Sequence, residues 1–380
     1  MRVGLLALMA GRRGGGPETY EVELIRAIAR LDHANEYVVY CTGPYTVDAL
    51  GIAQPNFRYC ILKPSFRPLS LSLTFPYLMR RDGLDFYHAL FTPPPLSTVP
   101  MVFTMHCISS LVHPEFYPRF VAYRLNYLLK QGMRQCHRMV CVSQTTLEHV
   151  HEHYGVERSR MSVAYNGVGA QYRPLDSAGS FEFVRRTLDI QRPYILFVGK
   201  IQKHKNVVRL VEAYAQFRAR TGSDTALILA GKPVTGVDEV HAAIARLGLA
   251  RHVRWLGYVP DQCLPPLYAA ARMFVFPSLW EGFGIPMIEA MSCGTPVVAS
   301  NATCLPEVAG DAARIFEAQS TEDLAAALEQ VESSPQYRET LIRRGFQRAA
   351  QFTWDNCARA TLAAYQPLGF RLPTADPALR

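Results

Sequence analysis

The sequence predicts an α/β protein with two doubly wound parallel-sheet domains in tandem, and three observations carry this prediction. At 380 residues and 42.6 kDa, the chain has the length of about two domains. Short apolar runs rich in β-formers alternate with stretches of helical periodicity, which is the pattern of a parallel sheet covered on both faces. The alternation stops at residues 173–193 and then starts again, so we expect a linker at 175–193.

Local patterns define the elements of the first half. An apolar strand at 3–10 precedes a loop rich in glycine, and apolar residues then recur at helical spacing from Tyr20 to Leu31. The further elements that we expect here are strands at 36–41, 57–62, 85–90, 99–105, 138–142 and 162–165, and helices at 115–134 and 144–154.

The second half repeats the alternation. Ligands of such sheets bind at the carboxyl ends of the strands, so we expect the site residues in the loops that follow them, in a cleft between the domains. The expected strands are 194–198, 226–230, 253–256, 273–276 and 296–299, and the expected helices are 207–220, 237–247, 264–271, one that begins at 286, and several that fill much of 320–365.

Composition excludes several classes of protein. Hydrophobic residues make up 49% and charged residues 19%, which is ordinary for a globular chain and excludes disorder, collagen and coiled coil as the main structure. No run approaches the roughly 20 apolar residues that span a bilayer. The nine cysteines are odd in number and form no C-x-x-C, as in proteins of a reducing compartment. We therefore expect a cytoplasmic protein.

The charge balance allows an anionic partner. The net charge is +8, and it is spread along the chain without a tract rich in lysine and arginine. A nucleic-acid-binding protein normally gathers basic residues on one face, often with interleaved aromatics. We therefore expect no nucleic-acid partner, although a non-catalytic binder of an anionic polymer stays an alternative.

The most specific motif runs from Glu281 to Glu289, with Gly282, Gly284 and Pro286 between the two carboxylates. Proline suits the first position of a helix, and glycine lets backbone approach a ligand closely. The helix start offers free N–H groups and a positive dipole end to an anion. Two carboxylates thus flank an anion-binding helix start, unless the segment is an ordinary strand-to-helix turn.

A second motif follows the expected strand at 194–198. Gly199 is followed by Lys200, Lys203 and Lys205, and lysine is a compact charge suited to phosphate. This segment predicts a diphosphate site, with a solvated basic loop as the alternative. The glycines at 14–16 and His106, at the end of an apolar strand, are weaker signals, since a simple turn explains the glycines equally well and most lone histidines are structural.

Taken together, these motifs resemble those of a family 4 glycosyltransferase of the GT-B fold (glycosyltransferase group 1), in the same order along nearly the whole chain. The E-x7-E of Glu281 and Glu289 is the specific part of the resemblance. The supporting parts are the glycine loop, the strand that ends at His106, Tyr165-Asn166-Gly167-Val168, Phe197-Val198-Gly199-Lys200 with Lys205-Asn206, Gly257-Tyr258-Val259 and Phe352-Thr353-Trp354.

The resemblance implies a role for each matching residue. Glu281 and His106 are implied to be catalytic, Glu281 facing the donor sugar and His106 near the reacting centre. Lys200, Lys205, Gly15 and Gly16 are implied to bind the donor diphosphate; Phe283, Gly284 and Ile285 the donor sugar; and Glu289, Gly257, Tyr258 and Val259 the ribose and base.

The resemblance also implies the domain plan and the stereochemistry. Residues 1–174 would form the acceptor-binding domain and 194–351 the donor-binding domain, while a C-terminal helix in 352–380 would cross back to the first domain. Such enzymes retain the anomeric configuration. Chains with a similar glycine-rich start, "YVVY" strand and "FTPP" loop tend to be mannosyltransferases of surface polysaccharide assembly, which favours GDP-mannose over a UDP-sugar.

The chemistry of the leaving group can be argued from the residues. A nucleotide-sugar donor releases a diphosphate, whose charge is stabilised either by a metal held by Asp-x-Asp or by basic residues and a helix start. The chain contains no Asp-x-Asp. We therefore expect no metal and no cofactor, with the nucleotide-sugar as a substrate.

The acceptor is the least specified part. A saccharide or a lipid-linked saccharide fits the resemblance, and a sugar-nucleotide epimerase of the same fold is an alternative that needs no acceptor. The segment 115–138 mixes arginines with aromatic residues, and such a helix either covers the sheet or rests on anionic lipid. A peripheral contact with the inner membrane face therefore stays open.

Overall fold

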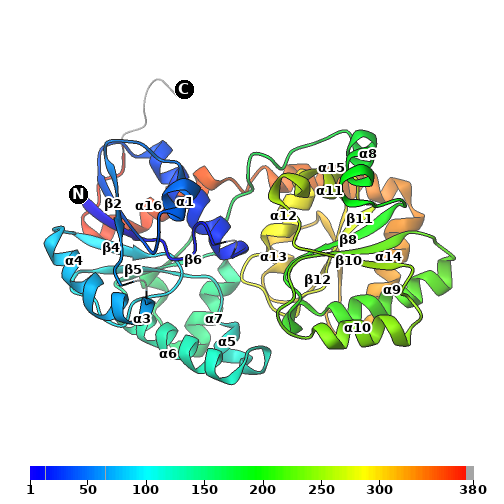
Figure 1. Ribbon diagram of the computed structural model, residues 1–380, viewed down its shortest axis with the longest axis horizontal. Helices are drawn as coiled ribbons and strands as arrows, with labels where there is room; N and C mark the ends of the chain where they lie inside the picture. The colour runs from blue at the N-terminus through cyan, green and yellow to red at the C-terminus, as the bar shows by residue number, and fades with distance from the viewer. Residues whose placement is uncertain (13, 65, 374–380) are drawn as a thin grey trace. The chain divides into compact units, whose positions relative to one another are not determined.

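The computed structural model describes residues 1–12, 14–64 and 66–373. The chain forms two compact units, one of Met1–Gly167 together with the residues from Trp354 onward, and the other of Val168–Thr353. Each unit contains one sheet in which all neighbouring strands are parallel, with helices on both faces (Figure 1). The predicted fold class is confirmed.

The sheet of the first unit has seven strands in the order β3-β2-β1-β4-β5-β6-β7. The order reverses between β1 and β4, so the ligand edge of a doubly wound sheet lies at the loops after these two strands. The strands are β1 (Arg2–Leu6), β2 (Glu36–Cys41), β3 (Phe57–Ile61), β4 (Phe86–Ala89), β5 (Met101–Met105), β6 (Arg138–Cys141) and β7 (Met161–Val163).

One expected helix of the first unit is interrupted by a proline. The expected helix at 115–134 is broken, because Tyr117 is extended before Pro118 and α6 begins only after this proline. The helices are α1 (Gly16–Leu31), α2 (Tyr45–Leu50), α3 (Arg67–Leu69), the π-helical turn η1 (Ser70–Thr74), α4 (Phe75–Arg81), α5 (Ser109–Val112), η2 (Pro114–Phe116), α6 (Arg119–Gln135), α7 (Gln144–Tyr154), η3 (Arg158–Arg160), α16 (Trp354–Tyr365) and η6 (Gln366–Leu368).

The sheet of the second unit has six strands in the order β10-β9-β8-β11-β12-β13, with the reversal between β8 and β11. The last strand was not expected from the sequence. The strands are β8 (Tyr194–Val198), β9 (Ala226–Ala230), β10 (Val253–Gly257), β11 (Met273–Phe276), β12 (Val297–Ser300) and β13 (Ala313–Phe316). The helices are α8 (Ser177–Leu188), η4 (Lys203–Lys205), α9 (Val207–Thr221), α10 (Val237–Arg246), η5 (Asp261–Cys263), α11 (Leu264–Ala269), α12 (Ile285–Ser292), α13 (Leu305–Ala309), α14 (Thr321–Ser333) and α15 (Pro335–Ala349).

The boundary between the units lies earlier than the sequence suggested. The segment 175–193, expected as a linker, contains α8, whose first turn is capped by Asp176 accepting the N–H of Gly179 at 2.7 Å. This helix packs against α11 and belongs to the second unit, which begins at Val168 and not at 194. The prolines around it therefore mark the ends of a helix and not a loose connection.

The C-terminal helix α16 lies in the first unit, as expected, and packs against α1, β6 and β7. Its last residue anchors it through a buried polar chain: the hydroxyl of Tyr365 is 2.7 Å from Nδ1 of His88, and Nε2 of His88 is 2.7 Å from Oγ1 of Thr104. The Tyr20 hydroxyl lies 2.9 Å from the same Oγ1. Within the predicted 352–380, residues 374–380 lie outside the described part of the chain, and residues 352 and 353 remain with the second unit.

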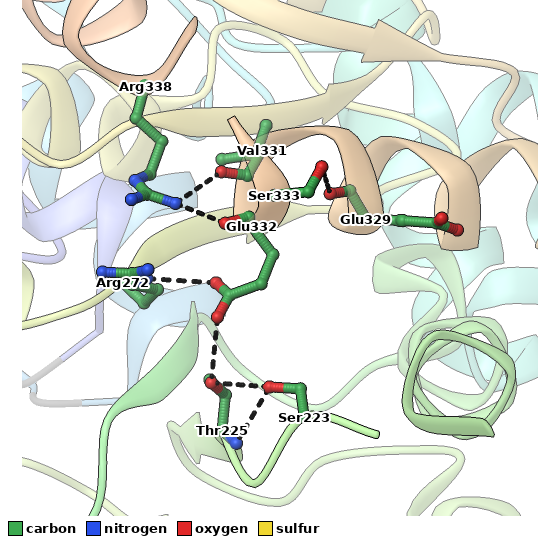
Figure 2. Close-up of polar contacts among 8 residues, drawn as sticks. All are labelled: Ser223, Thr225, Arg272, Glu329, Val331, Glu332, Ser333 and Arg338. Atoms are coloured by element: carbon green, nitrogen blue, oxygen red, sulfur yellow. Dashed lines mark hydrogen bonds and ion pairs between the residues drawn. The ribbon is translucent and has the colours of Figure 1, made fainter. Parts of the chain in front are cut away.

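A polar network fixes the edge of the second sheet where β9 and β11 begin (Figure 2). Glu332, near the end of α14, accepts hydrogen bonds from Arg272 Nε at 3.1 Å and from Thr225 Oγ1 at 3.4 Å. Arg338 of the next helix donates to the carbonyl oxygens of Val331 and Glu332 at 3.0 and 2.5 Å. The bonds of Glu332 tie α14 to the amino-terminal ends of β9 and β11, and those of Arg338 tie α15 to the end of α14.

We expect the Tyr365→Phe variant to be less stable than the wild type. The change removes the hydroxyl that pairs with Nδ1 of the fully buried His88, and an unpaired buried polar group costs about 1–3 kcal/mol. The measurement is thermal unfolding followed by circular dichroism. Tyr77→Phe, at a side chain that is 64% exposed, is the matched control. Equal melting temperatures for all three proteins would contradict the anchoring role.

Candidate active site

The carboxyl ends of three neighbouring strands in the second unit meet through glycines. The N–H of Gly199, after β8, donates to Ala230 at 2.9 Å, and the N–H of Gly231, after β9, donates to Gly257 at 2.7 Å. A Cβ at Gly231 would lie 1.9 Å from the carbonyl oxygen of Gly199, so no larger residue fits there. This close approach brings the loops that begin with Lys200 and Lys232 together.

Lys232 was missed in the sequence, although Gly231-Lys232 repeats the Gly199-Lys200 pattern directly after a strand. The two loops are joined by a hydrogen bond of 2.9 Å from the N–H of Ile201 to the carbonyl of Lys232. Lys232 Nζ also lies 4.9 Å from the centre of the Tyr258 ring, in cation–π geometry. A second basic side chain therefore accompanies the predicted loop of Gly257, Tyr258 and Val259.

The predicted residues Lys205 and Glu281 form an ion pair between Lys205 Nζ and Glu281 Oε1. Both side chains are largely buried, with 14% and 13% exposure. Lys205 lies on η4, the turn that follows β8. Its Nζ is 5.0 Å from the centre of the Phe276 ring at the end of β11. A basic group and a carboxylate thus meet at the reversal of strand order, which is the ligand position of this sheet type.

Thr303 holds the backbone of Glu281 and was not predicted. Its hydroxyl accepts the N–H of Glu281 at 3.0 Å and donates to the carbonyl of Glu281 at 2.9 Å. Thr303 has a φ of +49°, an uncommon conformation for a β-branched residue, and such strain is found where position matters. No sequence pattern signals this pairing, because it joins loops 22 residues apart.

The start of α12 follows the E-x7-E prediction closely. The helix begins at Ile285, so Pro286 is its second residue and not its first. Gly284 has a φ of +97°, and a Cβ there would lie 3.0 Å from Leu305 Cδ2 and 3.2 Å from Phe276 Cε1. Phe283, Gly284 and Ile285 are all buried. The helix start is therefore set tightly against the end of β11, with its positive dipole end at the ligand edge; Pro286 has no N–H, and the N–H of Met287 donates to the carbonyl of Gly284 at 3.0 Å.

Glu289 lies deeper than Glu281 and has different partners. Its side chain accepts a hydrogen bond of 3.0 Å from the Tyr268 hydroxyl, and the residue is only 8% exposed. The Tyr172 ring packs edge to face on Tyr268 at 5.9 Å. Burial raises the pKa of Glu289 to about 7, while the hydroxyls of Tyr268 and Tyr172 oppose the shift. The structure thus places the two carboxylates of the motif in separate settings.

The glycine loop of the first unit is organised by a buried carboxylate, Glu21. Its two oxygens accept the N–H groups of Leu8, Met9 and Ala10 at 3.2, 2.6 and 2.9 Å. These bonds engage the N–H groups of residues 8–10, so β1, which ends at Leu6, does not continue to residue 10 as expected. Burial raises the pKa of Glu21 to about 7, against the effect of the three N–H groups.

The predicted glycines follow on the same loop. Gly15 is the residue before α1, with a φ of +76°, and Gly16 is its first residue; no side chain caps this helix start. Together with the carbonyl of Gly15, which accepts the N–H of Glu18 at 2.8 Å, they make a tight entry into the helix. The glycine backbone thus forms the turn between the end of β1 and α1.

His106 lies directly after β5, in the same unit as this loop. Its Nε2 is 2.8 Å from the carbonyl oxygen of Leu90, which only accepts, so Nε2 carries the proton. The ring packs edge to face on Tyr20 at 4.6 Å, and burial lowers the pKa of His106 to about 4. At neutral pH the imidazole is therefore uncharged, and Nδ1 has a lone pair to accept a hydrogen bond.

The predicted site residues thus fall into two groups. His106, Gly15 and Gly16 belong to the first unit, and the remaining predicted residues lie around the carboxyl edge of the second sheet. Within the described parts of the chain, no cluster of three or more His, Cys, Asp or Glu could hold a metal ion. Among the described helices, none is long and apolar enough to cross a bilayer.

We expect Glu289→Gln to change the pH dependence of stability. The folded-state pKa is raised, so the wild type loses stability as pH rises from the unfolded value near 4.5 to about 7, where the buried carboxylate ionises. Glutamine stays neutral, and it can still accept the Tyr268 hydrogen bond. The melting temperature of the variant should exceed that of the wild type more at pH 8 than at pH 5. A difference that is independent of pH would contradict the assignment.

Comparison with known proteins agrees with this geometry. Residues 14–172 match the family described as Glycosyltransferase Family 4, and residues 180–348 match Glycosyl transferases group 1. The chain is 33% identical over 267 residues to O-antigen chain mannosyltransferase B of Escherichia coli, and the match covers 70% of each chain.

Two further similarities cover different shares of the proteins compared. The chain is 27% identical over 282 residues to the serotype-specific mannosyltransferase WbdA of Escherichia coli, and this match covers 72% of the chain but only 34% of WbdA. The fold is similar to that of HepE from Anabaena, solved with UDP and glucose, with a TM-score of 0.78, 20% identity, and coverage of 97% of this chain and 100% of that one. The chain therefore belongs to the family 4 glycosyltransferases of group 1, which have the GT-B fold.

Proposed function

We propose that the protein is a retaining, metal-independent glycosyltransferase that moves mannose from a nucleotide-sugar, with GDP-mannose favoured, to a saccharide or lipid-linked saccharide in polysaccharide assembly. The observation that carries the proposal is the ion pair of Lys205 and Glu281 beside the start of α12. The mannosyltransferases among its relatives support the choice of sugar. The nucleotide-sugar acts as a substrate, and no cofactor takes part.

The basic residues stabilise the departing diphosphate. Lys200 and Lys205 follow β8, and the α12 start adds N–H groups and a positive dipole end. Because such groups are already in place, little rearrangement is needed when negative charge develops on the leaving diphosphate. Removing one such group commonly lowers the rate by about 10²–10³. An incoming diphosphate competes for Lys205, and it therefore releases the Glu281 carboxylate from the ion pair as the donor binds.

The released Glu281 then faces the sugar. Its backbone stays fixed by Thr303, so the carboxylate moves only through its side-chain torsions. A carboxylate beside the anomeric carbon stabilises the positive charge of the sugar in the transition state. His106, neutral and with Nδ1 unprotonated, accepts a hydrogen bond from a sugar hydroxyl. Glu289 and the loop of Gly257, Tyr258 and Val259 hold the ribose and base, and Gly15 and Gly16 line the phosphate.

A peripheral membrane contact fits one face of α6. Phe120, Tyr123 and Tyr127 recur at helical spacing and are 76%, 75% and 52% exposed. Arg119 and Arg124 lie on the same helix, and a basic, aromatic surface binds anionic lipid. We therefore propose that the enzyme works in the cytoplasm at the inner membrane face, where a lipid-linked acceptor would be presented.

The function is tested by a transfer assay with GDP-mannose, UDP-glucose and ADP-glucose, each with and without EDTA, followed by release of nucleoside diphosphate. We expect one donor to be consumed only when acceptor is present, and activity to survive EDTA, because Lys200, Lys205 and the α12 start carry the leaving charge. The Glu281→Gln variant should lose at least 100-fold in rate. The control is Lys203→Gln, because this exposed lysine lies on the same turn, η4, as Lys205.

Three outcomes would contradict the proposal. Loss of activity in EDTA that is restored by Mn²⁺ or Mg²⁺ would exclude the metal-independent mechanism. Isomerisation of the donor without acceptor would indicate an epimerase. A rate for Glu281→Gln equal to that of the wild type would remove this carboxylate from the reaction.

We expect Thr303→Val to lower the transfer rate by about 30-fold while leaving the fold intact. Valine keeps the shape but removes the hydroxyl that fixes both backbone groups of Glu281, at about 1 kcal/mol for each hydrogen bond. The loss should fall on kcat, since the donor contacts of the lysines remain. Thr340→Val is the control, because that hydroxyl is exposed and bonds only within its own helix. A rise in the KM for the donor with an unchanged kcat would contradict this role.

A further inference from the structure

Three arginines from separate elements gather at the ligand edge of the first sheet. Arg12, on the loop after β1, donates from Nη2 to Thr42 Oγ1 at 2.8 Å and to the Tyr45 hydroxyl at 2.6 Å. Arg67, at the start of α3, donates from Nη2 to the carbonyl of Leu8. Leu8 and Thr42 directly follow β1 and β2, so both guanidinium groups lie at the carboxyl ends of these strands.

The third arginine, Arg124, comes from α6. Burial, then the charge of Arg12 and, more weakly, that of Arg124 lower the pKa of the Arg67 guanidinium. The three positive charges are therefore close enough to repel one another. Among the residues that the structure describes, none of the three takes part in a salt bridge, whereas other exposed arginines of the chain, such as Arg30 and Arg158, do.

Among the described residues, the carboxylate that acts on Arg67 is that of Glu21, and one carboxylate cannot balance three charges. Glu21 interacts with Arg67, but both of its oxygens accept backbone N–H groups of the loop. Burial also raises the pKa of Glu21 to about 7, so at neutral pH it carries only part of a negative charge. The edge of the first sheet thus has an uncompensated positive charge held in fixed positions.

Two details show that this group is built into the fold. Arg67 is partly buried, and its Nε is buried without a hydrogen-bond acceptor among the described residues, which is rare for a charged donor. Arg12 is oriented by the Tyr45 ring, with its Cζ 5.3 Å from the ring centre. A guanidinium that is held in place binds phosphate with two parallel hydrogen bonds at a small entropic cost.

We propose that Arg12, Arg67 and Arg124 form an anion subsite for the acceptor, and that the acceptor carries a phosphate or diphosphate group. The proposal rests on the glycosyltransferase function, because only then does the first unit have an acceptor to bind. Phosphate chemistry fits both a lipid diphosphate and a soluble sugar phosphate. The donor diphosphate has its own basic residues, Lys200 and Lys205, in the other unit.

The test measures binding of inorganic pyrophosphate by calorimetry to the full chain loaded with the nucleoside diphosphate that stabilises it best. Loading fills the donor site, so further binding reports on the first unit. We expect pyrophosphate to bind, and to bind about 10- to 100-fold more weakly to an Arg12→Gln/Arg67→Gln variant, since bonds to charged groups contribute about 1.5–3 kcal/mol. Arg124→Gln, at an exposed side chain, should weaken binding less, without disturbing the loop.

Arg158→Gln is the matched control, because this exposed arginine precedes β7 at the opposite edge of the same sheet and pairs with Glu148. Unchanged pyrophosphate affinity in all arginine variants, or no binding to the loaded wild type, would overturn the subsite. Failure of every nucleoside diphosphate to bind would instead contradict the proposed function. Competition by farnesyl diphosphate identifies a lipid source of the phosphate, and competition by mannose 1-phosphate a soluble one.

Discussion

The pairing of β8 with β11 is the constraint on which the carboxyl-terminal edge of the second sheet depends. These strands lie side by side, with Met273 opposite Ile195, although 78 residues separate them in the sequence. Because both are parallel, their carboxyl ends place η4 and the loop before α12 at one point. Lys205 and Glu281 can therefore form a largely buried ion pair, and Thr303, on the loop after β12, can fix the backbone of the carboxylate. A change in strand order would separate all three.

The two units treat charge at their ligand edges in opposite ways. In the second unit the basic group, Lys205, has a carboxylate partner, Glu281, so under the proposed function a donor diphosphate has to displace this carboxylate. In the first unit the arginines repel one another, and the nearest carboxylate is committed to backbone N–H groups. Under the two proposals, the ion pair of the second unit rearranges when the donor binds, whereas the arginines of the first unit are already in place and are stabilised by an anion.

Local pattern was sufficient for most of the fold. Apolar runs and helical spacing located the strands of both sheets, except β13, which is short and only partly buried. The E-x7-E and Gly-Lys patterns were sufficient for Glu281, Lys205 and the helix start, because those residues lie within a few positions of a strand end. Thr303 and Glu21 could not be found in this way. Their roles come from hydrogen bonds to segments 22 and about 12 residues away, which depend on the tertiary fold.

Each unit also keeps one buried glutamate inside the helix that follows its ligand loop, Glu21 in α1 and Glu289 in α12. Burial raises both pKa values to about 7, so each carboxylate lowers stability as pH rises from about 4.5 to 7. An apolar residue of similar size would avoid this cost. Glu21, however, shapes the glycine loop with three hydrogen bonds, and Glu289 orients the tyrosines beneath the donor edge. Both carboxylates thus organise the carboxyl-terminal edge of a sheet at a cost in stability.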